Sequence, residues 1–185
     1  FFEEEEKRLA PILRAGLERA QELAKTMNMP DLLVELSQGV RLHTEGVEGL
    51  VIGPAYWTTP LILYEQLDPH SMILLFGARP ADMAAIPGEL VPEALLRSLR
   101  ALSDPTRLKI LHYLQQEALT PSALARRLNL RAPTVTHHLG ELRMAGLVTL
   151  DISGQEKYYT TRFEALENAI EQLKDFIRKP SREDE

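Results

Sequence analysis

The sequence predicts an α+β chain in which a small α/β domain precedes a helix-rich domain that closes with a β-hairpin. Three observations predict this class. Apolar residues recur at helical steps over residues 3–27, short apolar runs alternate with turn residues over 40–77, and helical segments followed by two strand-like runs occupy 93–161. The length of 185 residues suits one large or two small domains.

The composition excludes several classes of protein. The chain has no cysteine, so neither disulfides nor cysteine-ligated metal sites can form. Its longest apolar runs, such as Met72–Phe76, are far shorter than the roughly 18 residues that cross a bilayer. We therefore expect a cytoplasmic protein with no membrane partner. The chain begins at Phe1 rather than at a methionine, which is compatible with a piece of a longer protein.

The net charge of −6 is unevenly distributed along the chain. Residues 1–92 hold 7 basic and 14 acidic side chains, residues 93–162 hold 10 and 6, and residues 163–185 hold 4 and 7. Phosphates attract a locally basic surface whatever the total charge of the protein. The middle segment is therefore compatible with a nucleic-acid partner.

The first 92 residues are predicted to form an N-terminal domain. The spacing predicts a helix over 3–27 with four glutamates in its first turn, and a shorter helix over 31–38 that Gly39 ends. Three or four short strands follow and are expected to form one small sheet against these helices: Val40–His43, Leu50–Ile52, Leu61–Tyr64 and Met72–Phe76. The proline-rich residues 78–92 are the predicted linker.

Residues 93–162 are predicted to form a second domain. A helix over 93–102 precedes helices that begin after Asp104 and Thr120, each a capping residue followed by proline. A further helix runs from about Ala132 to Ala145 and ends at Gly146. Two helices joined by a tight turn predict a helix-turn-helix, and the strand-like runs 147–152 and 157–161 predict a hairpin, or wing, directly after it.

Four segments of this domain resemble the ArsR-type winged-helix transcriptional regulators. They are Ala101–Arg107, Leu124–Leu130, Pro133–Leu139 and Leu142–Val148, with Gly154, Tyr158 and Tyr159 following in the hairpin. These motifs run in family order at family spacing over residues 95–161. The resemblance implies a sequence-specific regulator that binds double-stranded DNA, a homodimeric repressor that an effector releases from its operator.

The second helix of the motif is the expected recognition helix, whose N-terminal turns read base edges in the major groove. Its candidate DNA-reading residues are Arg131, Thr134, Thr136, His137 and His138, whereas Val135, Leu139 and Leu142 are expected in the core. Candidate phosphate contacts are Ser122, Arg126, Arg127, Arg107 and Lys157. Two alternatives remain open. Arg107 could pair with a neighbouring carboxylate, and one of the two histidines could pack, because adjacent helical residues point about 100° apart.

The chain departs from the family pattern at two places. Arg131 and Ala132 stand where the family usually has a serine cap and a polar reader. Asp151, Ile152 and Gln155 replace the arginines expected along the wing. We therefore expect a wing that contacts phosphates poorly, with Lys157 nearly alone there, and DNA binding that depends mainly on the recognition helix.

The C-terminal helix, residues 163–178, has an apolar stripe at coiled-coil spacing, before a tail at 179–185. The stripe consists of Phe163, Leu166, Ile170, Leu173 and Ile177. The resemblance implies that it forms a two-fold interface with Leu95 and Leu99 of the helix over 93–102, although packing on its own domain is the alternative. A homodimer then predicts a palindromic operator with half-sites about 10 base pairs apart.

Residues 1–92 are the candidate effector-sensing region of such a regulator. No cofactor or metal site is expected, because cysteine is absent, residues 163–177 lack histidine, and His43, His70 and His112 are isolated. Tyr56 and Trp57 are candidates to line an apolar pocket for a small-molecule effector, with a role in the core as the alternative.

An enzyme and a protein-binding module are the two other classes of function to consider. We predict no enzyme, because the sequence lacks a glycine-rich phosphate loop, a paired His/Glu motif and a serine elbow. The alternative to a DNA-binding regulator is a winged-helix module that binds proteins without specific DNA binding, which the acidic flanks and acidic wing favour.

Overall fold

The computed structural model describes residues 2–80, 82–83 and 91–178, which form two compact units. The first unit comprises residues 1–80 with 149–157, and the second comprises 81–148 with 158–185. The predicted tail 179–185 and most of the predicted linker lie outside the described residues. The predicted α+β class is confirmed. Among the described residues, no helix has the length and apolar character needed to span a membrane.

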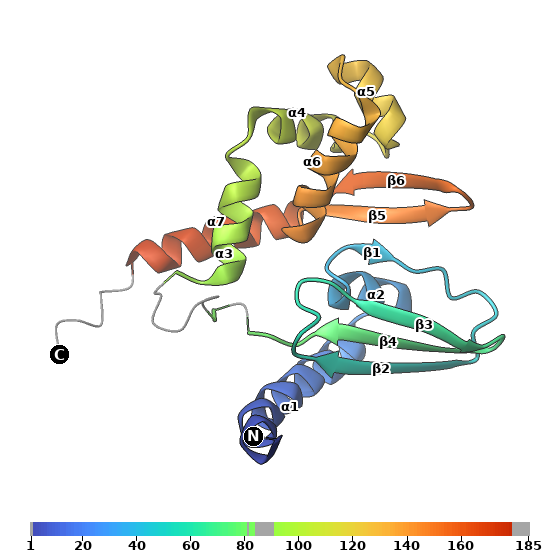
Figure 1. Cartoon of the computed structure of the whole chain (residues 1–185), viewed down its shortest axis with the longest axis vertical. Coiled ribbons are helices and arrows are strands. Elements are labelled where there is room, and N and C mark those ends of the chain that lie inside the picture. Colours follow the sequence, from blue (N-terminus) through green and yellow to red (C-terminus); the bar gives the residue numbers. More distant parts are fainter. Residues whose placement is uncertain (1, 81, 84–90, 179–185) are drawn as a thin grey trace. The chain divides into compact units, whose positions relative to one another are not determined.

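The first unit begins with two helices, α1 (Phe2–Thr26) and α2 (Met29–Leu36). Asn28 caps α2 by accepting the backbone N–H of Asp31 at 3.0 Å. The apolar sides of both helices meet the sheet in a small core of Ala20, Leu32, Leu36 and Phe76. Burial of these side chains holds the helices on one face of the sheet (Figure 1).

Three strands of the first unit form a mixed sheet in the order β2-β4-β3. Strand β2 (Gly49–Ala55) runs parallel to β4 (Ser71–Gly77), and β3 (Leu63–Asp68) runs antiparallel to β4. Leu74 and Phe76 are buried, while the alternate residues Ile73 and Leu75 are only partly covered. This sheet matches three of the predicted strand runs.

The fourth predicted run, at Val40, does not join this sheet. Strand β1 (Val40–Arg41) instead pairs in parallel with β5 (Val148–Ser153), so that the second sheet has the order β1-β5-β6. Gln38 and Gly39 have positive φ angles of 55° and 104°, which redirect the chain after α2. The expectation of one N-terminal sheet is thereby corrected, and the contacts group residues 149–157 with the first unit.

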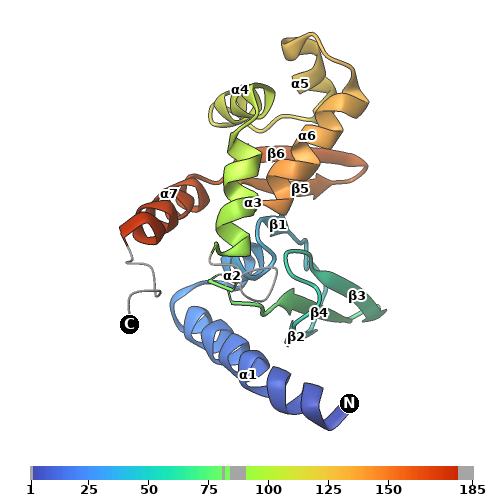
Figure 2. The same cartoon turned by 60° about the vertical axis from the view of Figure 1, so that its left-hand side comes forward.

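The second unit contains five helices and β6 (Glu156–Thr161), whose first two residues belong to the first unit. The helices are α3 (Glu93–Leu102), α4 (Pro105–Leu114), α5 (Pro121–Leu128), α6 (Ala132–Met144) and α7 (Phe163–Arg178). Figure 2 shows α5 and α6 as a packed pair and α7 beside α3. Nine large apolar side chains of this unit are less than 2% exposed: Leu95, Ile110, Leu114, Leu124, Val135, Leu139, Leu142, Leu147 and Val148.

Candidate nucleic-acid interface

The turn between α5 and α6 is set by the sequence at both ends of α5. Thr120 caps α5 by accepting the Ala123 N–H at 3.2 Å. Asn129 then adopts the left-handed conformation, with φ 54° and ψ 46°, and the N–H of Leu130 donates to the Ala125 carbonyl at 2.9 Å. This turn ends α5 and directs the chain into α6, which gives a helix-turn-helix.

Helix α6 has a strictly apolar inner face and a polar outer face. Val135, Leu139 and Leu142 are completely buried. Thr134, Thr136 and His137 are exposed, as is Arg131 at the N-cap, which makes no side-chain capping bond. The Thr136 hydroxyl donates to the Ala132 carbonyl at 3.0 Å, and its oxygen lone pairs can still accept. Four of the five candidate readers therefore lie on the exposed surface at the start of α6.

His138, the fifth candidate reader, packs against the start of α4. Its side chain is 15% exposed, and its Nδ1 lies 3.9 Å from Asp104 Oδ1. Asp104 caps α4 by accepting the Arg107 N–H at 2.9 Å, and this bond, assisted by the charges of Arg107 and His138, lowers the pKa of Asp104. Of the two adjacent histidines, His138 is the one that packs inward and His137 the one that faces out.

Arg107, a candidate phosphate contact, is a residue of α4 whose side chain reaches the C-terminus of α3. Its Nε donates to the Ala101 carbonyl and its Nη2 to the Arg100 carbonyl, both at 2.6 Å. A cation here satisfies carbonyls that a helix end leaves unpaired and opposes the negative end of the helix dipole. Arg107 thus joins α3 to α4 through backbone carbonyls and not through a carboxylate, an arrangement that the residue spacing alone did not indicate.

The other predicted phosphate contacts on the helix-turn-helix differ in their surroundings. Ser122 and Arg126 are exposed. Arg127 donates to Glu117 Oε1 at 2.6 Å, and its guanidinium lies 5.8 Å from the centre of the Tyr113 ring. Arg126 is therefore the better-placed cation of α5, because Arg127 already has a carboxylate and an aromatic ring beside it.

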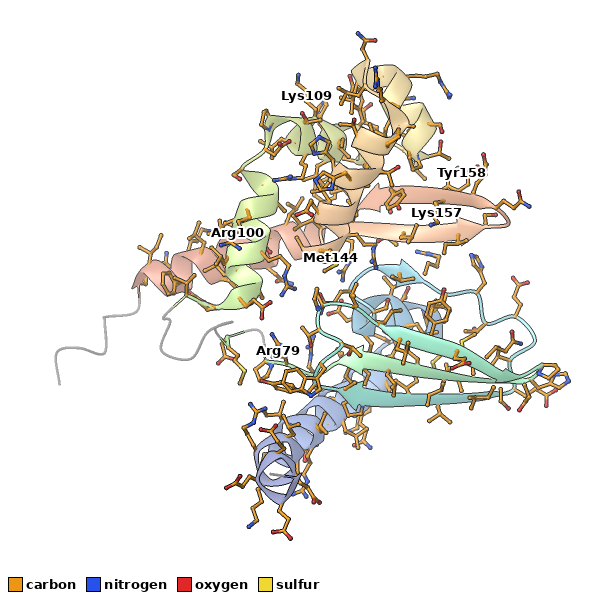
Figure 3. All side chains as sticks on the ribbon, viewed as in Figure 1. Arg79, Arg100, Lys109, Met144, Lys157 and Tyr158 are labelled. Atoms are coloured by element: carbon orange, nitrogen blue, oxygen red, sulfur yellow. The ribbon has the colours of Figure 1, made fainter. Side chains whose placement is uncertain are left out.

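The hairpin between α6 and α7 carries one exposed lysine, Lys157, and two acidic strand residues, Asp151 and Glu156. Lys157 lies on β6 (Figure 3) and is exposed. Asp151 on β5 contacts two residues of the N-terminal segment, Arg41 at 3.6 Å and His43 at 2.9 Å. Sequence reasoning noted the missing wing arginines but missed these partners. The signal in the sequence is Asp151 itself, because an acidic residue at a position where a basic one is expected calls for a cationic partner from elsewhere in the chain.

The predicted interface residues fall into two groups. Phe163, Ile170 and Ile177 on α7 are exposed, whereas Leu166, Leu173 and Leu99 are partly covered. Leu95 is completely buried in the chain, so its side chain belongs to the core and is not available to a second copy. Helices α3 and α7 lie in contact with each other.

The two candidate ligand residues lie beyond the carboxyl end of β2. Tyr56 is buried and Trp57 is 71% exposed, and their rings meet edge to face at 4.8 Å. The guanidinium groups of Arg8 and Arg79 lie 5.4 and 5.2 Å from the centre of the Tyr56 ring. Arg79 follows β4, which runs parallel to β2, so that the two strand ends meet at one edge (Figure 3). In the described part of the chain, no group of three or more acidic or histidine side chains could hold a metal ion.

Comparisons with known proteins agree with this geometry. A family model described as a helix-turn-helix domain matches residues 102–151. The transcriptional repressor SdpR of Bacillus subtilis is 35% identical over 80 residues, which cover 43% of this chain and 89% of that protein. The HTH-type transcriptional regulator CmtR of Mycobacterium bovis is 38% identical over 85 residues, or 46% of this chain and 72% of that protein.

A solved structure, an ArsR-like transcriptional regulator from Rhodococcus sp. RHA1, is 32% identical with a TM-score of 0.42 and covers 44% of this chain and 75% of its own. The residues that the family model matches include α5, α6 and the first part of β5. The relatives are transcriptional regulators rather than enzymes, in agreement with the sequence prediction. Through its similarity to SdpR and CmtR, the chain belongs to the ArsR-type family of winged helix-turn-helix transcriptional regulators.

Proposed function

We propose that the chain is a homodimeric repressor that binds a palindromic double-stranded DNA operator in the cytoplasm and is released by a small-molecule effector sensed in residues 1–92. The observation that carries the proposal is the division of α6 into a completely buried face and an exposed polar face. A helix supported in this way can enter the major groove without losing its packing.

In this proposal Arg131, Thr134, Thr136 and His137 read bases. Arginine and histidine donate to guanine acceptors, and threonine contacts a base edge or a thymine methyl group. Ser122, Arg126 and Lys157 contact phosphates and so position the helix without specifying sequence. His138 and Arg107 support the site from behind, through α4 and the end of α3.

The dimer is proposed from the apolar surface of α7. Phe163, Ile170 and Ile177 expose large side chains along one helix, and such stripes are usually covered by a partner. Ile170→Glu is expected to convert the dimer to a monomer in sedimentation velocity, because a buried unpaired charge opposes association. Glu167→Gln on the same helix is the control. A monomer for the unmodified chain at micromolar concentration would contradict the dimer.

Selection of bound fragments from a random DNA pool tests the function as a whole. The expected result is a palindrome with half-site centres about 10 base pairs apart, because each protomer presents one α6 to the groove. A non-palindromic site would contradict the two-fold arrangement. Failure to enrich any sequence would contradict specific DNA binding and would favour the protein-interaction module.

The effector is proposed to bind beside Trp57. An exposed tryptophan packed on Tyr56 reports directly on binding at this edge of the sheet. Small-molecule ligands that release the operator are expected to change Trp57 fluorescence with the same midpoint. Operator release without any fluorescence change would place the effector elsewhere.

A further inference from the structure

Strand β1, Val40–Arg41, gives the wing a third strand. Val40 and Arg41 pair in register with Leu150 and Asp151 of β5, and the N–H of Leu150 donates to the Gly39 carbonyl at 2.6 Å. Val40 and Leu150 are both buried. All of these residues, and the hairpin segment 149–157, belong to the first unit.

The segment before β1 is held in place independently. Ser37 is buried and its hydroxyl both donates to the Val40 carbonyl at 2.8 Å and accepts the Val40 N–H at 2.9 Å. Two consecutive residues with positive φ, Gln38 and Gly39, then fix the direction of the strand. Because the Ser37 hydroxyl and the pairing with β5 both hold its backbone, β1 places the Arg41 side chain at a defined position along β5, and His43 follows two residues later.

These two side chains change the charge of the wing. The segment 149–157 by itself carries Asp151 and Glu156 against Lys157, an acidic balance that phosphates repel. Arg41 Nε lies 3.6 Å from Asp151 Oδ2, and His43 Nε2 lies 2.9 Å from Asp151 Oδ1. The N-terminal segment thus places a permanent cation beside the wing carboxylate.

Arg41 is placed to do more than pair with Asp151. Its side chain is 51% exposed, and arginine has five N–H donors in a planar fork. A guanidinium whose Nε is directed at a carboxylate can still offer its Nη edge to a phosphate oxygen. An exposed ion pair of this kind contributes little to stability, so the pairing does not by itself account for the arginine.

We propose that β1 takes part in DNA binding together with the hairpin of β5 and β6. In this proposal Arg41, which comes from the N-terminal region, contacts a DNA phosphate in place of the missing wing arginines. The inference rests on the proposed function, in which Lys157 on the same hairpin contacts a phosphate. It adds residues 40–43 to the DNA-binding surface.

The salt dependence of operator binding tests the proposal. Arg41→Gln is expected to reduce the slope of log affinity against log salt by about 0.9 for each Arg41 that contacts a phosphate, and to lower affinity about eightfold per contact at 0.1 M salt. Arg41→Lys should retain the slope, because a phosphate contact needs only the charge. The matched control is Arg19→Gln, which removes an exposed arginine of the same unit that also pairs with a carboxylate, Glu35 at 3.4 Å.

An unchanged slope for Arg41→Gln would overturn the proposal while leaving DNA binding itself intact. Loss of binding in every variant, Arg19→Gln included, together with no enrichment from the DNA pool, would instead overturn the proposed function. An equal change of slope for Arg41→Gln and Arg19→Gln would also overturn the proposal, since it would show a general effect of net charge.

A cross-link tests whether β1 stays on the wing when DNA binds. Val40→Cys with Leu150→Cys joins register partners on strands about 4.8 Å apart, within the span of a disulfide. Because the chain has no other cysteine, this bond is the only disulfide that can form within one chain, and non-reducing gel electrophoresis separates it from cross-links between copies. The oxidised protein is expected to bind the operator as tightly as the reduced protein. A tenfold loss on oxidation would mean that β1 must leave the wing, and would overturn the proposal.

Discussion

Helix α6 and the hairpin of β5 and β6 are neighbours in the sequence, but they differ in which parts of the chain form their polar surfaces. The polar face of α6 is complete within one helix, since Val135, Leu139 and Leu142 anchor it from behind. The hairpin has one exposed lysine, and its Asp151 contacts His43, which lies 108 positions away in the sequence, and Arg41. The proposed DNA-binding surface is thus local to one helix at α6, whereas at the hairpin it is assembled from distant segments of the chain.

The largest expected effect is on the support of α6. Leu139→Ala removes a completely buried side chain and is expected to lower the free energy of unfolding by about 3 kcal/mol, through lost burial and the cavity left behind. Chemical denaturation measures it. Thr136→Ala, on the exposed face of the same helix, should change stability by less than about 0.5 kcal/mol. Equal effects would show that α6 is not anchored on one face.

The next effect concerns the outer face of α6. Thr136→Ala and His137→Ala are each expected to cost about 1–3 kcal/mol of operator discrimination, or roughly five- to 150-fold in the affinity ratio of operator to mismatched DNA. Fluorescence anisotropy with both DNAs measures the ratio. Glu141→Ala, another exposed change on α6, is the control. A uniform loss on both DNAs would assign these side chains to phosphates rather than bases.

A smaller effect is expected at the cap behind α6. Asp104→Ala removes the acceptor of the Arg107 N–H and should cost about 1 kcal/mol of stability at neutral pH. The pKa of Asp104 is lowered in the folded chain, so its contribution is present above the ordinary carboxyl pKa and is lost as pH falls through the folded value. The difference in unfolding free energy between the unmodified chain and the variant should therefore shrink on acidification. A difference that grows at low pH would contradict this assignment.

The last effect is expected at the hairpin lysine and appears in the salt dependence of binding, not in sequence preference. Lys157→Ala should reduce the salt slope of operator binding by about 0.9 per phosphate contact, without altering the preference among sequences. Lys25→Ala on α1, where the lysine pairs with Glu22, is the control. A loss larger than that of the α6 variants would reverse the order of importance proposed for the helix and the wing.

The sequence predicted the helices of the second unit and the winged helix-turn-helix because their signals are local. Asp104 and Thr120 cap their helices as predicted, and Gly146 has the expected positive φ of 71°. Each such signal acts within a few residues of the chain. The division of α6 into buried and exposed faces follows from the same periodicity.

The contacts that the sequence could not predict are long-range or depend on side-chain geometry. Strand β1 has only two residues, and no local pattern specifies that it pairs with β5 rather than with the adjacent strands. The choice between His137 and His138 depends on the rotation of α6 against α4. Arg107 donates hydrogen bonds to backbone carbonyls, and because every residue has a carbonyl, the sequence does not indicate which ones it contacts.

The pairing of β1 with β5 also bears on how this protein can be divided. A fragment that starts at the α3 helix would leave the outer backbone of β5, including the Leu150 N–H, without its strand partner. Exposed strand edges of apolar sequence recruit other chains, and Leu150 and Ile152 lie on this one. Without β1, the exposed edge of β5 is expected to make the fragment aggregate. A soluble fragment that contains the helix-turn-helix and the hairpin should therefore also contain residues 37–43.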